Sequence, residues 1–279
     1  VLVQPIDPAA QPHLSTALSE ITQGRPAAVA QVVEGPEHLL GPVLSLLGSD
    51  QAAHGHMDGG PADRAVTDRS RALLRAGRTA RVDIGGTGDE GPERLSVLVH
   101  VHASRPRLLI FGAVDFAAAL SQAGRFLGYH VTVCDARPVF ATTARFPHAD
   151  EVVADWPHRY LERAEVDERT AVCVLTHDAK FDIPLLRLAL ELPVAYVGAM
   201  GSRRTHEERL HLLREEGVTE DRLARLRSPI GLDLGARTPE ETAVSITAEI
   251  IARANRGTGR PLGRLIGPIH RPARVTLAG

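Results

Sequence analysis

The sequence predicts an α/β protein in which a Rossmann-type, doubly wound parallel sheet is preceded by a smaller α+β domain. Two observations support this fold class. From about residue 105 onward, short and nearly continuous apolar runs alternate with helical patterns, which is typical of strands buried on both faces and joined by right-handed crossovers. Before residue 103 the pattern is irregular, and the stretch 94–102 alternates along its length as a strand with one buried face does.

The N-terminal domain is predicted to span residues 1–103, with its boundary in the segment 103–106. Gly77 is placed as the left-handed residue that ends a helix. The predicted elements are a helix at 12–22, a strand at 27–33, a glycine- and histidine-rich loop at 48–60, a helix at 63–76 and a strand at 94–102.

The Rossmann domain is predicted to span residues 104–262, followed by an extended tail at 263–279. Its strands are predicted at 108–111, 131–134, 151–154, 171–175 and 194–197. The helices are predicted from their ends: one ends at Gly128, one opens at Pro157, one starts at Asp182 as N-cap with Pro184 in its first turn, one runs from the N-cap Ser202 to Gly217, and one opens with a capping box at Thr238.

Composition excludes several classes of function. A net charge of -2 gives no general attraction to nucleic acid or to an anionic membrane, and 4% of aromatic residues is too few for a base-stacking surface. No signal peptide is visible, and no run approaches the roughly 20 apolar residues that span a bilayer. Cys134 and Cys173 both fall in predicted buried strands, so we expect no disulfide, no iron–sulfur site and a reducing, cytoplasmic compartment.

Polar and glycine-rich clusters follow four of the predicted strands. They lie at 112–115, 135–138, 176–178 and 198–204. Because the carboxyl ends of parallel strands share one edge of a sheet, where ligands bind at the topological switch point, these clusters predict one binding site. The expected ligand carries a phosphate.

The first two clusters resemble a dinucleotide-binding turn in part. Gly112 permits a tight turn toward a phosphate, but Val114 stands where the G-x-G-x-x-G fingerprint has its second glycine, which disfavours ordinary NAD binding. The alternative is a plain strand-to-helix turn. Asp135 is placed to bond a ribose hydroxyl, and Arg137 either grips a phosphate or pairs with Asp135.

The other two clusters offer polar and cationic groups. His177 and Asp178 are candidates for ligand contact or acid–base chemistry, the alternative being that Asp178 caps a turn; no metal site is predicted there or in the histidine-containing loop 54–58. The turn from Gly198 leads to Ser202 and Arg203 at a helix start, where N–H groups and a guanidinium form an anion site. Arg204 with Glu208 is equally a surface pair.

Motifs spread along the C-terminal half resemble one family. They are Val-Cys-Asp-Ala-Arg-Pro at 133–138, Arg-Phe-Pro at 145–147, Thr-His-Asp at 176–178, Tyr-Val-Gly-Ala-Met-Gly-Ser at 196–202, Pro-Ile-Gly-Leu at 229–232 and Thr-Pro-Glu-Glu-Thr-Ala-Val-Ser-Ile at 238–246. With these motifs the chain resembles the XdhC/CoxI family, the accessory proteins of xanthine dehydrogenase and carbon monoxide dehydrogenase maturation.

The resemblance implies a non-catalytic chaperone that binds molybdenum cofactor, as molybdopterin or its dinucleotide, protects it and inserts it into a molybdenum hydroxylase such as xanthine dehydrogenase. A cysteine desulfurase is a second candidate partner, and a homodimer is expected. The candidate cofactor-binding residues are Gly112, Asp135, Arg137, His177, Asp178, Gly198, Ser202 and Arg203.

The chain also departs from the family pattern. The family's glycine-alanine-glycine-histidine turn is replaced at 112–115, and its cysteine motifs have no cysteine here at 56–61 or 85–88. The alternative function is an NAD(P)-dependent oxidoreductase, with His177 and Asp178 as its catalytic candidates and Asp135 as the ribose anchor. A regulatory nucleotide-binding module is a third reading.

Overall fold

The computed structural model describes residues 9, 11–47, 52–56, 60–85, 94–267 and 269. Its residues divide into two compact units, the first reaching Ser104 and the second spanning Arg105–Gly267. The predicted loop at 48–60 lies partly outside the described residues, as do the glycines at 86–88 and most of the predicted tail at 263–279. No helix in the described ranges is long and apolar enough to cross a membrane.

The first unit is an antiparallel sheet with the strand order β3-β2-β1-β5-β4. Three of these strands were not predicted, and one of them, β3, lies within the predicted loop 48–60. Gly77 ends α2 in the left-handed conformation, as predicted. The elements are α1 (Pro12–Thr22), β1 (Ala27–Glu34), η1 (Glu37–Leu39), β2 (Gly41–Leu47), β3 (Ala52–His54), α2 (Pro61–Ala76), β4 (Ala80–Ile84) and β5 (Leu95–His102).

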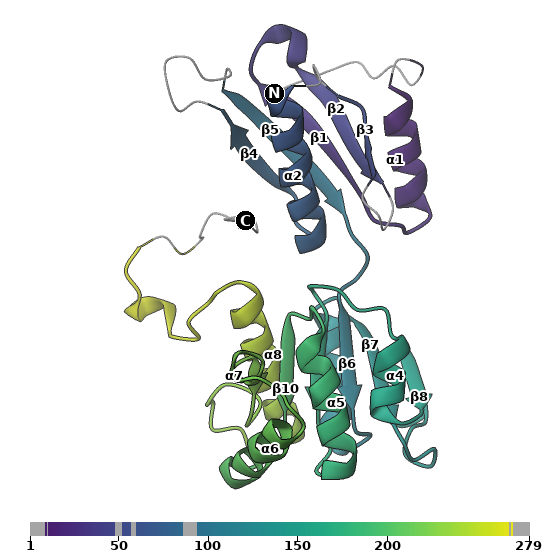
Figure 1. Ribbon diagram of the computed structural model, residues 1–279, viewed down its shortest axis with the longest axis vertical. Coiled ribbons are helices and arrows are strands. Elements are labelled where there is room, and N and C mark those ends of the chain that lie inside the picture. The colour runs from purple at the N-terminus through teal and green to yellow at the C-terminus, as the bar shows by residue number, and fades with distance from the viewer. Residues whose placement is uncertain are drawn as a thin grey trace. The chain divides into compact units, whose positions relative to one another are not determined.

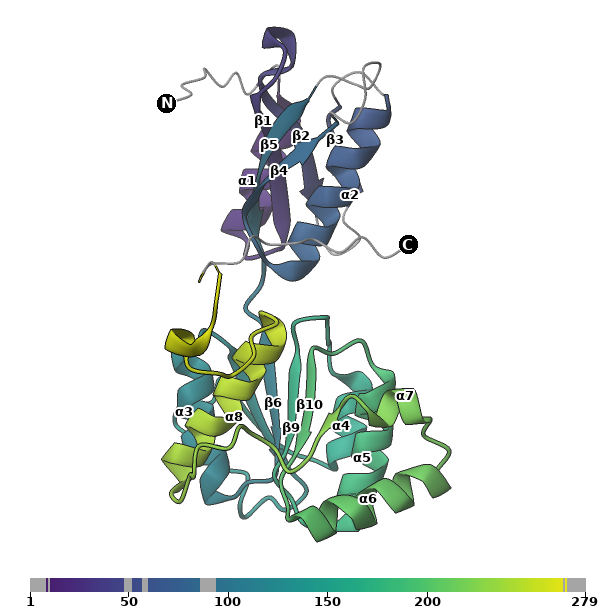
Figure 2. The same cartoon turned by 90° about the vertical axis from the view of Figure 1, so that its left-hand side faces the viewer.

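Two helices cover opposite faces of this sheet (Figure 2). Ala17 of α1 packs against Ala27 of β1, whereas α2 packs its Leu73 into the cluster that contains Ala28. Successive residues of a strand point to opposite faces, so the neighbours Ala27 and Ala28 meet different helices.

The second unit is a parallel sheet with the strand order β11-β10-β9-β6-β7-β8. Numbered along this unit the order is 6-5-4-1-2-3, the Rossmann arrangement, which confirms the predicted fold class. The strands are β6 (Arg107–Phe111), β7 (His130–Asp135), β8 (Glu151–Ala154), β9 (Ala171–Val174), β10 (Tyr196–Ala199) and β11 (Leu226–Arg227). The helices are α3 (Asp115–Phe126), α4 (Pro157–Arg163), α5 (Ala179–Glu191), α6 (Arg203–Glu215), α7 (Glu220–Leu223), α8 (Pro239–Ala254) and η2 (Leu262–Arg264).

The sheet is covered on both faces, as its continuous apolar strands require (Figures 1 and 2). Leu120 of α3 and Ile246 of α8 pack on one face, in a cluster with Ile110 of β6. Leu161 of α4 and Leu186 of α5 pack on the other, in a cluster with Leu109. The loops that follow the strands are left at the edge, where the site is expected.

Two of the three predicted helix N-caps are observed. Ser202 caps α6, accepting a hydrogen bond from Thr205 N at 3.1 Å, and Thr238 forms the predicted capping box with Glu241. The prediction for α5 was wrong. Asp178, not Asp182, is its N-cap, and Pro184 lies inside the helix. Asp182 is instead buried in an ion pair with Arg209, which explains why an acidic residue stands at a position that is not a helix cap.

Candidate functional site

The loops after β6 and β9 meet at the switch point of the parallel sheet. These strands are neighbours, but the helices that follow them, α3 and α5, cover opposite faces. Gly112 lies at the meeting point with φ 109°, a conformation that other residues rarely adopt. A Cβ placed there would lie 2.8 Å from Thr176 Cγ2 and 3.0 Å from Thr176 N. Glycine is therefore required for this close approach.

The turn after Gly112 is tied to the end of β7. Ala113 N donates to Asp135 Oδ2 at 2.8 Å, so this N–H is not free for a phosphate. Helix α3 begins at Asp115, with Val114 as an N-cap that contributes no side-chain bond. This turn therefore spends one of its N–H groups on the end of β7.

Asp135 lies at the end of β7 with only 3% of its surface exposed. Its carboxylate accepts from Arg137 N, Nε and Nη2, each at 2.9 Å, besides Ala113 N. Burial raises the pKa of this carboxyl, but the hydrogen bonds from Arg137 and Ala113 outweigh it and hold the pKa below its ordinary value. Of the two sequence interpretations of Arg137, pairing with Asp135 is the one observed.

Arg137 presents a half-exposed guanidinium on the loop after β7. Its side chain is 51% exposed and lies over the Phe140 ring at 4.5 Å from the centroid. Arg145 lies 5.5 Å from the same centroid and donates to Ala113 O at 3.1 Å. The segment after β7 therefore folds over the turn after β6, with cationic groups on its surface.

His177 and Asp178 are both exposed in the loop after β9. Asp178 accepts from Lys180 N at 3.0 Å as the N-cap of α5, which is the structural role anticipated as an alternative. Asp178 also acts electrostatically on Arg137, so the loops after β7 and β9 come near each other. Within the described part of the chain the His177 side chain forms no hydrogen bond, and it is free to contact a ligand.

The remaining candidates lie around the start of α6. Gly198 is buried within β10, where a Cβ would lie 2.6 Å from Ile230, so its role here is packing. Ser202 and Arg203 are exposed, and no ion pair of Arg203 is found among the described residues. Arg204 pairs with Glu208 at 2.9 Å, as the surface alternative predicted.

A buried ion pair supports this edge and was missed in the sequence. Arg209 of α6 donates to Asp182 Oδ2 at 2.8 Å, and each side chain is 3% exposed. Arg209 also donates to Met200 O and to Ser228 Oγ, both at 3.1 Å, and Asp182 accepts from Thr176. Burial raises the pKa of Asp182 against these bonds. The network joins the loops after β9 and β10.

An aromatic group at the end of β8 was also missed. Trp156, two residues beyond β8, lies 5.2 Å from Phe181 between ring centroids. Lys180 Nζ lies 4.9 Å from the Trp156 centroid, within cation–π range. Trp156 is the only tryptophan of the chain and Lys180 its only lysine. Their rarity, and the place of Trp156 just after a strand, were the signals available.

Neither thiols nor a metal cluster add to this edge. Cys134 and Cys173 are buried in β7 and β9, and burial raises the pKa of both thiols, that of Cys134 to about 12. They are the only cysteines in the sequence. In the described ranges no three metal-ligating side chains gather, although residues 57–59 of the histidine-containing loop lie outside them.

Comparison with known proteins gives consistent matches. A family model described as the XdhC Rossmann domain matches residues 108–250. The chain is 31% identical over 260 residues to the uncharacterized protein YqeB of Escherichia coli, covering 89% of this chain and 47% of that protein. A protein of Bacillus subtilis described as a probable xanthine dehydrogenase subunit is 31% identical over 152 residues, covering 54% of this chain and 44% of that protein.

The chain also matches a cofactor chaperone in sequence and a solved structure in fold. The molybdenum cofactor insertion chaperone PaoD of E. coli is 31% identical over 144 residues, covering 52% of this chain and 39% of PaoD. This chain thus spans less than half the length of these curated relatives. A crystal structure described as a xanthine dehydrogenase from Bacillus halodurans superposes with a TM-score of 0.61 at 24% identity, over 95% of this chain and 74% of the other. This similarity concerns the fold alone.

Proposed function

The chain belongs to the XdhC family, and from this premise we propose that it binds the molybdenum cofactor and inserts it into a molybdenum hydroxylase of the xanthine dehydrogenase type. The relatives named for cofactor insertion and for xanthine dehydrogenase support the proposal. It treats the chain as an accessory protein rather than an enzyme. The proposal further includes a cytoplasmic homodimer and a cysteine desulfurase as a second partner.

The observation that carries the proposal is the group of exposed polar residues at the carboxyl edge of the sheet. The first turn of α6 has N–H groups that Ser202 leaves unbonded, and Arg203 adds a guanidinium. A phosphate, which every form of this cofactor carries, fits such a helix start. His177 lies on the neighbouring loop with no hydrogen bond among the described residues.

A planar ring fits the aromatic group at the end of β8. Trp156 offers an indole face that is now covered by the Lys180 ammonium. A bound heterocycle would replace that ammonium on the ring, and the freed lysine would gain an anion to pair with. The edge thus has a place for each part of a phosphate-bearing heterocycle.

The thiols do not fit a role as metal ligands. When bound, the cofactor supplies the molybdenum centre that the recipient enzyme uses for redox chemistry. Because Cys134 and Cys173 are the only cysteines and both are buried in strands, this chain has no accessible thiolate for the metal or its sulfur. We therefore propose that it holds the cofactor by phosphate and ring.

The other candidates have supporting roles in this proposal. Gly112 lets the loops after β6 and β9 approach each other, and Asp135 fixes the Arg137 guanidinium at the edge. Arg137 keeps a half-exposed guanidinium beyond its pairing with Asp135, and we propose this exposed part as a second anion contact. Gly198 acts through the packing of β10.

Equilibrium binding under anaerobic conditions tests the proposal. Molybdopterin, its cytosine dinucleotide, NAD and NADP are titrated into the full chain and into Arg203→Ala and His177→Ala. Loss of a charged hydrogen bond is expected to weaken pterin binding about tenfold for Arg203→Ala. The matched control is Arg187→Ala, an exposed arginine within α5 and away from the start of that helix, which should leave binding unchanged.

Transfer is tested separately, by adding the loaded chain to a cofactor-free molybdenum hydroxylase and measuring recovered activity. Recovery above that given by free cofactor supports insertion. Binding of NAD or NADP without any binding of pterin would contradict the proposal and favour an oxidoreductase, with His177 and Asp178 as its catalytic candidates.

A further inference from the structure

A small pocket lies at the amino-terminal ends of β10 and β11, opposite the strand ends of the cofactor site. Its volume is ≈ 80 Å³, and its walls include Tyr196 and three arginines, Arg225, Arg227 and Arg253. None of the residues that line it is acidic. The wall of the pocket is therefore strongly cationic.

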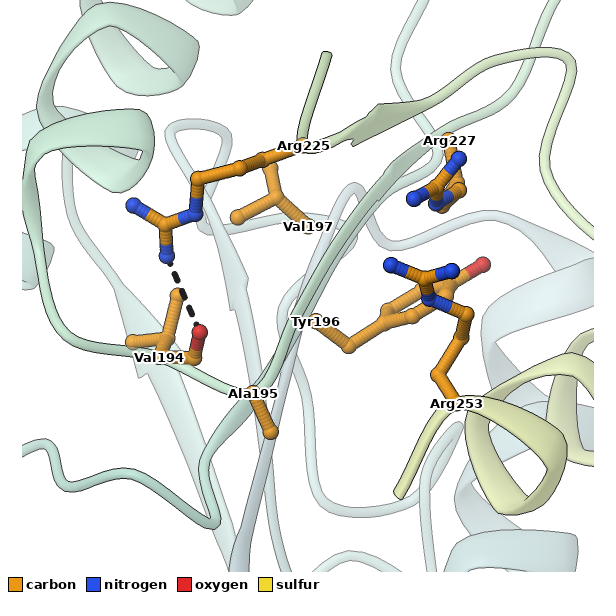
Figure 3. Close-up of a pocket in the computed structure, with 7 residues that line it drawn as sticks. All are labelled: Val194, Ala195, Tyr196, Val197, Arg225, Arg227 and Arg253. Carbon is orange, nitrogen blue, oxygen red and sulfur yellow. Dashed lines mark hydrogen bonds between the residues drawn. The ribbon is translucent and has the colours of Figure 1, made fainter. Parts of the chain in front are cut away.

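Only one of the three guanidinium groups is satisfied by the protein. Arg225 donates to the carbonyl oxygens of Leu190, Leu192 and Val194 at 2.6, 2.9 and 3.0 Å. Arg227 and Arg253 form neither a hydrogen bond nor an ion pair with the described residues. In Figure 3 these two guanidinium groups, one from the end of β11 and one from α8, point toward each other, whereas Arg225 turns toward Val194.

The nearby carboxylate does not pair with either arginine. Glu249 is one turn before Arg253 on α8, and its Oε2 accepts from Tyr196 Oη at 2.5 Å and from Gly231 N at 2.9 Å. No ion pair joins Glu249 to Arg227 or Arg253 among the described residues. Two unpaired guanidinium groups that face each other repel, and an anion between them would relieve that repulsion and accept from both.

Helix electrostatics explains only part of this arrangement. Arg253 stands in the last turn of α8, where a cation interacts favourably with the helix dipole. Arg227 is half-buried at the end of a strand, and no dipole of that kind favours it. The half-buried Arg227 and the exposed Arg253 therefore both keep donors that an anion from solvent can reach.

We propose that this pocket binds a phosphate group between Arg227 and Arg253. The planar, forked donors of two arginines match phosphate oxygens. The volume of ≈ 80 Å³ is far below the roughly 300–1,000 Å³ of pockets that enclose whole organic ligands, so the pocket admits the phosphate but no attached base. The site is independent of the cofactor-binding edge, and its test does not depend on the proposed function.

Arginine side-chain NMR on the full chain provides the direct test. The Nε–Hε resonances of Arg227 and Arg253 are assigned by their loss in Arg227→Gln and Arg253→Gln. Inorganic phosphate is then titrated at constant ionic strength against chloride, and ribose 5-phosphate is titrated in a second series. Both resonances are expected to shift and saturate together, while that of the exposed Arg187 does not. Which probe binds distinguishes free phosphate from a phosphate ester.

Dialysis of labelled phosphate against the variants gives the second measurement. Each single substitution should weaken this binding about tenfold, and Arg187→Gln, which removes the same charge, should not. The proposal is overturned if neither resonance saturates, or if Arg187→Gln weakens binding as much as the pocket variants do. If a glutamine variant does not fold, Arg227→Lys or Arg253→Lys, which keeps the charge but lacks the Nε–Hε group, provides the assignment, and the titration of the unsubstituted chain then decides between the two outcomes.

Discussion

Gly112 and Asp135 determine the shape of the edge at the scale of single residues. Gly112 allows the loops after β6 and β9 to approach each other. The buried carboxylate of Asp135 accepts hydrogen bonds from the backbone N–H groups of Ala113 and Arg137 and from the Arg137 guanidinium. Both residues stand directly after or at the end of buried strands, where the sequence pattern drew attention to them. Their observed contacts are with the protein itself, so we propose that they act on ligand binding through the shape of the edge.

Gly112→Ala should destabilise the second unit. The added Cβ would lie 2.8 Å from Thr176 Cγ2 and 3.0 Å from its backbone nitrogen, at a φ of 109° that alanine adopts only under strain. We expect a loss of about 1–3 kcal/mol in the free energy of unfolding, measured by urea denaturation. The control is Gly128→Ala, also at positive φ but with open space around it, which should cost less. Equal losses would contradict the close-approach argument.

Asp135→Asn should cost about 2 kcal/mol at neutral pH, because hydrogen bonds to a charged carboxylate are lost and the half-exposed Arg137 limits the effect. The folded-state pKa of Asp135 lies below its ordinary value of about 3.9. Its contribution is therefore full above that value and is lost as the pH falls through the lower, folded-state pKa. The difference in the free energy of unfolding between the two proteins should narrow on acidification below about pH 5. A difference that stays constant to about pH 2 would contradict this.

Single residues show what sequence reasoning can and cannot supply at the site. The cap Ser202 and the capping box at Thr238 depend on neighbours within four residues, and both were predicted. Whether Arg137 bound a phosphate or Asp135 was left open, because the answer depends on a backbone turn from another strand. Trp156, in the loop after β8, and Lys180, in the first turn of α5, come from separate elements, and their pairing has no local signal.

At the scale of elements, the edge is held by α5 and α6. Asp182 on α5 and Arg209 on α6 form a buried pair, and the same arginine holds Met200 O just before the turn that leads to Ser202. The pair therefore positions the first turn of α6. This is the turn that we propose as the phosphate contact.

Arg209→Met should be strongly destabilising. It leaves the Asp182 carboxyl buried without its partner, which typically costs about 3–5 kcal/mol. The double variant Asp182→Leu/Arg209→Met removes both charges and should recover part of that loss, as replaced buried pairs often do. Thermal and urea unfolding of the three proteins measure the coupling. A double variant that is less stable than the single one would contradict this account.

Helices and strands were predicted where the residues of the element itself carry a clear pattern. They were missed where the element is defined by its hydrogen bonds to a neighbouring strand. The five longer parallel strands were predicted to within two or three residues from continuous apolar runs. The two-residue β11 exists only through its register with β10, and β2 contains Pro42, which argues against a strand. For α5, the proline at 184 suggested a first turn, but Asp178 starts the helix earlier.

At the scale of the whole molecule, fold and family agree. The Rossmann strand order, the two core clusters that flank the parallel sheet and the family match all lie within residues 105–267. The site, the buried ion pair and the arginine pocket belong to this same unit.

The fluorescence of Trp156 tests the central claim most directly. It is the only tryptophan of the chain and lies at the proposed site, so its emission reports on that edge alone. The full chain is titrated anaerobically with molybdopterin, with a free tryptophan amide as the control for light absorption by the pterin. We predict saturable quenching, shifted to about tenfold higher pterin concentration by Arg203→Ala but not by Arg187→Ala. Emission that follows the free amide at every pterin concentration would contradict binding at this edge.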